Sequence, residues 1–208
     1  MIAIAPFIAQ QVTALLLYFA PALRSSNRGM EEHMAVASPI NFLQWIEEHR
    51  HLLKPPVGNQ CIYDGGDFIV MVVGGPNSRK DYHYDEGEEL FYQIEGDITV
   101  KIIDDGTPRD IHIRQGEMFL LPARVPHSPQ RGPNTVGLVI ERKRRSDELD
   151  GFLWFCERCG EKLYEEYLHV SDIVKQLPPI FERFYGNIEN RTCKKCGAVM
   201  EPPSPPKA

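Results

Sequence analysis

The sequence predicts a mainly β fold, a sandwich or barrel of short strands, for the central part of the chain. Short runs rich in Val, Ile, Leu and Phe alternate there with turn residues such as Gly, Asp and Pro. The overall composition, 42% hydrophobic and 25% charged, is that of a soluble globular protein. Strands are expected at residues 67–74, 90–95, 98–103, 111–113, 118–121 and 136–141.

Two turns separate strands in this region. Gly96-Asp97 lies between two apolar runs and predicts a two-residue hairpin. Asp104-Asp105-Gly106 predicts a second turn, before the strand that ends at Ile113.

Helices are expected on both sides of the β region. Ser38-Pro39 predicts a capped helix start, and apolar residues at helical spacing extend the helix to about His51. Near the C-terminus, a second helix is expected between Ser171 and Tyr185, interrupted or restarted at Pro178-Pro179.

Composition divides the chain into four parts. Residues 1–33 are an apolar leader, expected to be a disordered tail or an artefact of a start codon placed before Met30 or Met34; a targeting or anchoring role is the alternative. Residues 34–148 form the barrel, and residues 149–200 form a cysteine-containing extension. Residues 201–208, rich in proline, are expected to be disordered.

The charge excludes some classes of partner. With 23 basic and 29 acidic residues the net charge is −6, so neither nucleic acid nor an anionic membrane surface is an expected partner. The local basic run Arg142-Lys143-Arg144-Arg145 is interpreted as a solvated strand end.

Three residues form a candidate metal site: His83, Glu89 and His127. Two imidazoles and one carboxylate, with coordination positions left open, are typical of non-haem Fe(II) enzymes that activate O₂. The motif His83-x5-Glu89-x6-Gly96 is followed by Gly116-x5-Pro122-x4-His127, as two strand–turn units that bring ligands inward.

These two motifs resemble the signatures of the cupin family, whose double-stranded β-helix, a jelly-roll barrel, holds a metal in its mouth. The match has two departures: Asp85 stands where a second histidine is common, and Arg124 stands in place of a glycine. A three-ligand site therefore fits better than a four-ligand one. Three protein ligands leave room for substrate and O₂, which favours catalysis.

The four paired cysteines form a second candidate metal site. Cys156 and Cys159, and likewise Cys193 and Cys196, are Cys-x-x-Cys pairs followed by glycine. Four thiolates predict a closed, structural, rubredoxin-like site for iron or zinc in a reducing compartment, which places the protein in the cytoplasm. Two disulfides or a redox-active pair are the alternatives.

Cationic and polar side chains near the first site predict an acidic substrate. Arg79 lies four residues before His83 and Arg131 four after His127, and a guanidinium group binds a carboxylate bidentately. Glu141, in the last barrel strand, could accept a hydrogen bond from an amino or hydroxyl group.

Longer runs make the resemblance more specific. DYHYDEGEELFYQIEGDITVKIIDDG, GEMFLLPARVPHSPQRGPNTVGLVIERKR, DGFLWFCERCGEKLYEE and ERFYGNIENRTCKKCG resemble the 3-hydroxyanthranilate 3,4-dioxygenase family, in its short form with a C-terminal cysteine site. The similarity covers residues 38–200 and so includes both candidate metal sites.

The resemblance implies a set of roles. Fe(II) is expected at His83, Glu89 and His127, substrate-carboxylate contacts from Arg79 and Arg131, and hydrogen bonding to the ring substituents from Glu141; Glu89 is expected to border the substrate as well. It implies O₂-dependent cleavage of 3-hydroxyanthranilate to 2-amino-3-carboxymuconate semialdehyde, which cyclises to quinolinate, a precursor of NAD. A homodimer is also expected.

Two other functions are compatible with the same residues. One is a non-catalytic cupin sensor whose cysteine site docks a partner. The other is a cupin dioxygenase that acts on a thiol or on a different aminophenol.

Overall fold

The computed structural model describes residues 36, 38–55, 58–63, 66–171 and 173–204. The predicted leader at residues 1–33 lies outside these ranges. Residues 201–204 form neither helix nor strand, and the rest of the proline-rich end lies outside the description. No helix of the described residues is long and apolar enough to cross a bilayer.

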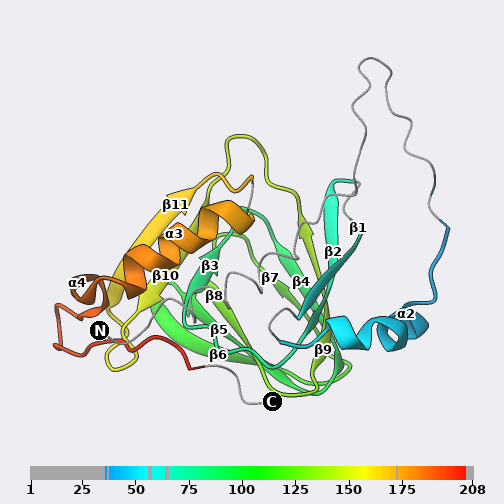
Figure 1. Cartoon of the computed structure of the whole chain (residues 1–208), viewed down its shortest axis with the longest axis horizontal. Helices are drawn as coiled ribbons and strands as arrows, with labels where there is room; N and C mark the ends of the chain where they lie inside the picture. The colour runs from blue at the N-terminus through cyan, green and yellow to red at the C-terminus, as the bar shows by residue number, and fades with distance from the viewer. Residues whose placement is uncertain (1–35, 37, 56–57, 64–65, 172, 205–208) are drawn as a thin grey trace.

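Two antiparallel sheets form the body of the protein (Figure 1). The first sheet has the order β1 (Asn59–Tyr63), β2 (Phe68–Gly74), β9 (Val136–Arg142), β4 (Glu89–Glu95) and β7 (Met118–Leu121). The second has the order β11 (Lys162–Leu168), β10 (Asp150–Phe155), β3 (Tyr82–Tyr84), β8 (His127–Arg131), β5 (Ile98–Asp104) and β6 (Thr107–Ile113). The predicted mainly β fold is confirmed.

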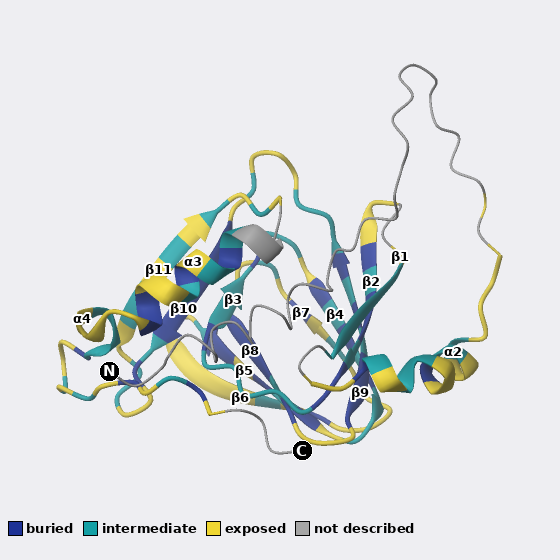
Figure 2. Cartoon of the chain, in the orientation of Figure 1, coloured by how far each residue is buried: buried dark blue, intermediate teal, exposed yellow. Residues whose placement is uncertain are grey.

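The main core lies between the two sheets, where alternate residues of each strand point inward. Phe91 and Val139 from the first sheet belong to the same buried cluster as Val100 and Ile102 from the second. Figure 2 shows the buried residues concentrated along these strands. The inward positions of β4 and β9 also include Glu89 and Glu141, so the apolar filling gives way to charged side chains at one end.

The structure corrects one of the two predicted turns. Gly96-Asp97 does not join a hairpin, because β4 pairs with β7 and β9 whereas β5 pairs with β6 and β8. The chain instead crosses there from one sheet to the other, and Gly96 permits this with a φ of +63°. The second turn is confirmed: Asp105 and Gly106, both with positive φ, close the β5–β6 hairpin.

The first helix starts later than predicted. Helix α2 spans Phe42–His49 and continues as a short 3₁₀ turn, Arg50–Leu52. Its N-cap is Asn41, not Ser38, because the Asn41 side chain accepts a hydrogen bond from the Gln44 N–H at 3.2 Å. Ile46 packs with Val72 of the first sheet, so the helix covers part of that sheet.

The C-terminal segment is attached to the barrel through β10, which pairs with β3. Helix α3 (Ile173–Tyr185) lies over β10 and β11 (Figure 1), and α4 (Ile188–Arg191) follows it. The interruption predicted at Pro178 and Pro179 is absent, because α3 continues through both residues. The buried contacts of α3 with Trp154 of β10, including a stacked Phe184 ring at 4.3 Å, favour the continuous helix despite the two missing N–H donors.

Candidate metal centre and substrate site

The three predicted metal ligands come together between the two sheets. His83 on β3 and His127 on β8 are directly paired in the second sheet, and Glu89 begins β4 in the first. One ligand atom from each lies within 4.8 Å of the others. These three residues, His83, Glu89 and His127, are called the metal group below, and they join opposite walls of the barrel.

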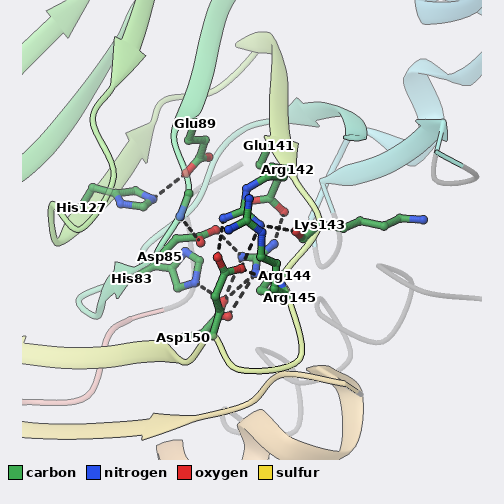
Figure 3. Close-up of polar contacts among 12 residues, drawn as sticks. His83, Asp85, Glu89, His127, Glu141, Arg142, Lys143, Arg144, Arg145 and Asp150 are labelled. Carbon is green, nitrogen blue, oxygen red and sulfur yellow. Dashed lines mark hydrogen bonds and ion pairs between the residues drawn. The ribbon is translucent and has the colours of Figure 1, made fainter. Parts of the chain in front are cut away.

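The contact between His127 and Glu89 fits a bound cation. Nδ1 of His127 lies 3.1 Å from the Val125 carbonyl oxygen, which can only accept, so Nδ1 carries the hydrogen. In the neutral ring, Nε2 then presents a lone pair to Glu89 Oε2, 2.8 Å away (Figure 3). This buried oxygen has no hydrogen-bond donor among the described residues. A cation between the two acceptors would satisfy both.

Electrostatics keep Glu89 ionised, as a metal ligand must be. Burial opposes its ionisation, but the positive charges of the neighbouring His127 and His83 rings, when these are protonated, outweigh burial and lower the pKa of the carboxyl group. A deprotonated carboxylate at this position is available for coordination at neutral pH.

His83 is oriented by two residues of β10. Its Nε2 lies 2.7 Å from Asp150 Oδ2, and its ring stacks against Phe152 with centroids 5.5 Å apart. Burial lowers the pKa of His83, but the hydrogen bond to Asp150 outweighs it and raises the pKa above the ordinary value. A carboxylate that holds one nitrogen of a ligating histidine fixes the direction of the other.

Glu141 lies beside the metal group. It is the direct cross-strand partner of Glu89, so both side chains point to the same face of the first sheet. Burial raises the pKa of Glu141, and the charge of Glu89 adds to this, while Arg144 opposes it. Glu141 therefore lies next to the candidate metal ligands, and its contact with a substrate stays a prediction.

Arg131 lies deeper in the same interior, four residues along β8 from His127 and on the same face. Its guanidinium donates to Gln93 Oε1 at 3.3 Å and is nearly buried. Gly137 of β9 leaves the space for this group, because a Cβ at that position would lie 2.9 Å from Arg131 Nη1. A cation is thus held inside the barrel.

Arg79 lies on the segment that leads into β3. Its guanidinium forms an ion pair with the buried Asp81 at 2.5 Å. Gln130, the neighbour of Arg131, donates to the Arg79 carbonyl oxygen at 3.4 Å, which connects the segments that carry the two arginines.

The four paired cysteines also come together, with all ligand sulfurs within 4.8 Å. Cys156 and Cys196 sulfurs are 3.6 Å apart and Cys159 and Cys193 sulfurs 3.5 Å, far beyond a disulfide bond and close to the ~3.8 Å edge of a tetrahedral zinc–thiolate site. Each pair ends in a glycine, Gly160 or Gly197, with a φ of +73°.

Each Cys-x-x-Cys pair with its following glycine forms a cysteine knuckle. Hydrogen bonding in the second knuckle, Cys193 to Gly197, favours a thiolate at Cys193. Burial raises the pKa of Cys193, but the backbone N–H groups of Lys195 and Cys196 outweigh burial and lower it to about 7. The backbone N–H of Glu161 lowers the pKa of Cys159, but burial and the hydrogen bonds shared with the other three thiols outweigh it and raise the pKa to about 12. Four thiols that lose protons one after another behave in this way, and a cation would favour loss of all four.

Sequence comparison agrees with this geometry. The model of the 3-hydroxyanthranilic acid dioxygenase family matches residues 34–185. The 3-hydroxyanthranilate 3,4-dioxygenase of Xanthomonas euvesicatoria is 57% identical over 165 residues, which cover 79% of this chain and 93% of the relative.

The chain belongs to the 3-hydroxyanthranilic acid dioxygenase family. Enzymes of the same name from Neurospora crassa and Jannaschia are 49% and 50% identical and are covered over 92% and 97% of their lengths. They match 80% and 84% of this chain, respectively. A cupin-2 domain protein of Shewanella frigidimarina, with a solved structure, is 20% identical, with a TM-score of 0.40 over 50% of this chain and 94% of its own.

In this family member, two residues beside the metal group were not indicated by the sequence. Asp150 holds His83, and Arg144 holds Asp150 in turn (Figure 3). The prediction of a solvated basic run was wrong for Arg144, whose side chain is only 14% exposed, and Arg142 pairs with Glu148 at 2.7 Å. A run of like charges carries no sign of the carboxylates that surround it after folding.

Proposed function

We propose that the protein is a 3-hydroxyanthranilate 3,4-dioxygenase that uses Fe(II) held by His83, Glu89 and His127. It converts 3-hydroxyanthranilate and O₂ to 2-amino-3-carboxymuconate semialdehyde, which cyclises to quinolinate on the route to NAD. The close approach of His127 Nε2 to the buried Glu89 Oε2, with His83 beside them, supports the metal, and membership of the family supports the reaction.

The side chains around the metal group are suited to this substrate. Fe(II), when bound, supplies open positions where the phenol and amine of the substrate and O₂ meet. Arg131, with Arg79, binds the substrate carboxylate through charge-assisted hydrogen bonds. Glu141, beside Glu89, accepts a hydrogen bond from the amino or hydroxyl group and so orients the ring. Both oxygen atoms enter the product, so the reaction needs no external reductant.

The barrel interior keeps water away from the reacting groups. Phe91 and Phe152 pack against the rings of His127 and His83, with centroids 6.3 and 5.5 Å apart. Apolar walls of this kind strengthen the interaction between the substrate carboxylate and the buried arginine.

The cysteine site has a structural role in this proposal. Cys156, Cys159, Cys193 and Cys196 hold a second iron or a zinc ion, and four thiolates leave no position for substrate. The protein acts as a cytoplasmic homodimer in which residues 149–200 support the barrel of residues 34–148.

An oxygen-uptake assay tests the proposal. The protein is loaded with Fe(II) under anaerobic conditions, mixed with 3-hydroxyanthranilate and exposed to air. Stoichiometric O₂ consumption with the transient absorbance of a semialdehyde supports it. Absence of uptake supports a non-catalytic sensor, and uptake with a thiol or another aminophenol in a substrate panel supports a different cupin dioxygenase.

A further inference from the structure

Arg144 connects three buried carboxylates that surround the metal group. Its Nη2 lies 2.9 Å from Asp85 Oδ2 and its Nη1 2.8 Å from Glu141 Oε1. Both Nε and Nη2 donate to Asp150, at 2.9–3.1 Å (Figure 3). All three guanidinium nitrogens therefore donate, and together they reach three different carboxylates.

Each of these carboxylates leads to a different part of the site. Asp150 accepts the hydrogen bond of His83 Nε2. Glu141 stands opposite Glu89 and faces the proposed substrate position. Asp85 accepts from the Gly87 N–H at 2.8 Å, inside the loop that carries the chain from His83 to Glu89.

The charges explain why a cation is needed here and why its shape matters. Asp85, Glu141 and Asp150 are each more than 90% buried, and Glu89 adds a fourth carboxylate nearby. Buried like charges repel one another unless a counter-ion compensates them. Lysine would supply the charge, but only a planar guanidinium presents donors along three fixed directions at once.

We propose that Arg144 is a positioning residue of the active site. It holds Asp150 so that His83 is directed at the metal, and it holds Glu141 so that the carboxylate is directed at the amine or hydroxyl of the substrate. The second role depends on the proposed function, whereas the first requires only that His83 binds a metal.

The test compares Arg144→Lys with the wild-type protein. This variant keeps the positive charge but loses the planar guanidinium group and its several donors. Arg142→Lys is the matched control, because Arg142 belongs to the same basic run but pairs with Glu148. Circular dichroism establishes folding. Three dissociation constants are then measured without O₂, for Fe(II), for 3-hydroxyanthranilate and for 3-hydroxybenzoate, which lacks the amine. The ratio of the last two gives the preference for the amine.

Arg144→Lys is expected to bind Fe(II) about 10–100-fold more weakly, as when the support of a ligating histidine is lost. It is also expected to lose most of the wild-type preference for 3-hydroxyanthranilate, about tenfold for one hydrogen bond to a charged group. Arg142→Lys keeps both properties. A residue that served stability alone would leave the ligand preference of the folded protein unchanged.

A folded Arg144→Lys protein with wild-type Fe(II) affinity and ligand preference would overturn the proposal. If that variant does not fold, Asp150→Asn decides. This change replaces one of the two oxygens that accept from Arg144 with an NH₂ group and keeps an acceptor for His83. Unchanged Fe(II) affinity in Asp150→Asn would then overturn the proposal. If the wild-type protein binds neither aromatic acid and takes up no O₂, the proposed function fails, and the Fe(II) comparison still tests the role of Arg144.

Discussion

Gly137 and Arg131 show how one missing side chain makes room for a buried charge. Arg131 crosses the interior from β8 to reach Gln93 on β4, and its guanidinium passes over Gly137 on β9. Any side chain at position 137 would meet Gln93 Oε1 at 2.7 Å and Arg131 Nη1 at 2.9 Å. The glycine therefore leaves the space that the guanidinium of Arg131 needs, and in the proposed function it shapes the substrate site through that arginine.

Replacing Arg131 by Ala is expected to raise KM strongly while iron content stays near wild type. One charge-assisted interaction with the substrate carboxylate is lost, about 2 kcal/mol or roughly 30-fold in kcat/KM. Steady-state kinetics and iron analysis on one preparation measure this. Arg109→Ala, which removes an exposed arginine on β6, serves as the control. Unchanged kinetics in Arg131→Ala would remove Arg131 from the site.

Gly137→Ala is expected to have a milder form of the same effect. The added methyl group forces Gln93 or the Arg131 guanidinium to shift, so KM should increase about tenfold, as for a weakened hydrogen bond to a charged group, with little change in iron content. Gly132→Ala is a suitable comparison, because nothing lies within 4 Å of a Cβ built at position 132. Equal KM values in the two variants would contradict the close approach.

At the scale of elements, local sequence patterns predicted where strands lie better than they predicted which strands pair. The runs that became β2, β4, β5 and β9 were recognisable from apolar periodicity. The sheet to which each belongs was not, because Gly96-Asp97 suits a hairpin and a crossing between sheets equally well. Likewise, motif spacing indicated His83, Glu89 and His127 as a candidate metal group, which the structure brings together, whereas the contacts of Arg144 and Asp150 with that group exist only after folding.

Strand β10 links the two candidate metal sites. It begins at Asp150, which holds His83, and ends just before Cys156 of the first cysteine knuckle. Between these ends, Phe152 stacks on His83 and Trp154 packs against α3. The knuckles therefore hold the far end of a strand whose near end supports a proposed iron ligand.

Cys193→Ser is expected to lower thermal stability while the folded fraction keeps its turnover per catalytic iron. Loss of one thiolate weakens the closed site, and a cost of about 2 kcal/mol would lower Tm by roughly 4–8 °C in a chain of this length. Calorimetry and activity per iron measure the two effects. Cys61→Ser, at a cysteine outside the four-sulfur group, is the matched control.

One result would contradict the structural role of the cysteine site. A folded Cys193→Ser protein with a full complement of catalytic iron and no turnover would assign the cysteines a direct part in the reaction.

On the scale of the whole molecule, the metal group is a bridge between the two sheets. His83 and His127 belong to the second sheet, whereas Glu89 belongs to the first. With neither a metal ion nor a proton between them, the His127 lone pair and the Glu89 carboxylate face each other at 2.8 Å. A bound ion would convert this unfavourable contact into a connection between the two walls of the barrel.

Fe(II) is therefore expected to stabilise the wild-type protein through this bridge. At a free concentration 100 times Kd, binding to the folded state adds about 2.7 kcal/mol, which corresponds to roughly 5–10 °C in Tm for a chain of this size. Anaerobic calorimetry with and without Fe(II) measures the shift. His127→Ala should lose most of it, whereas His51→Ala, at an exposed position, should retain it. Because the cysteine site remains intact in His127→Ala, an equal shift in that variant would assign the stabilisation to the cysteines and not to the bridge.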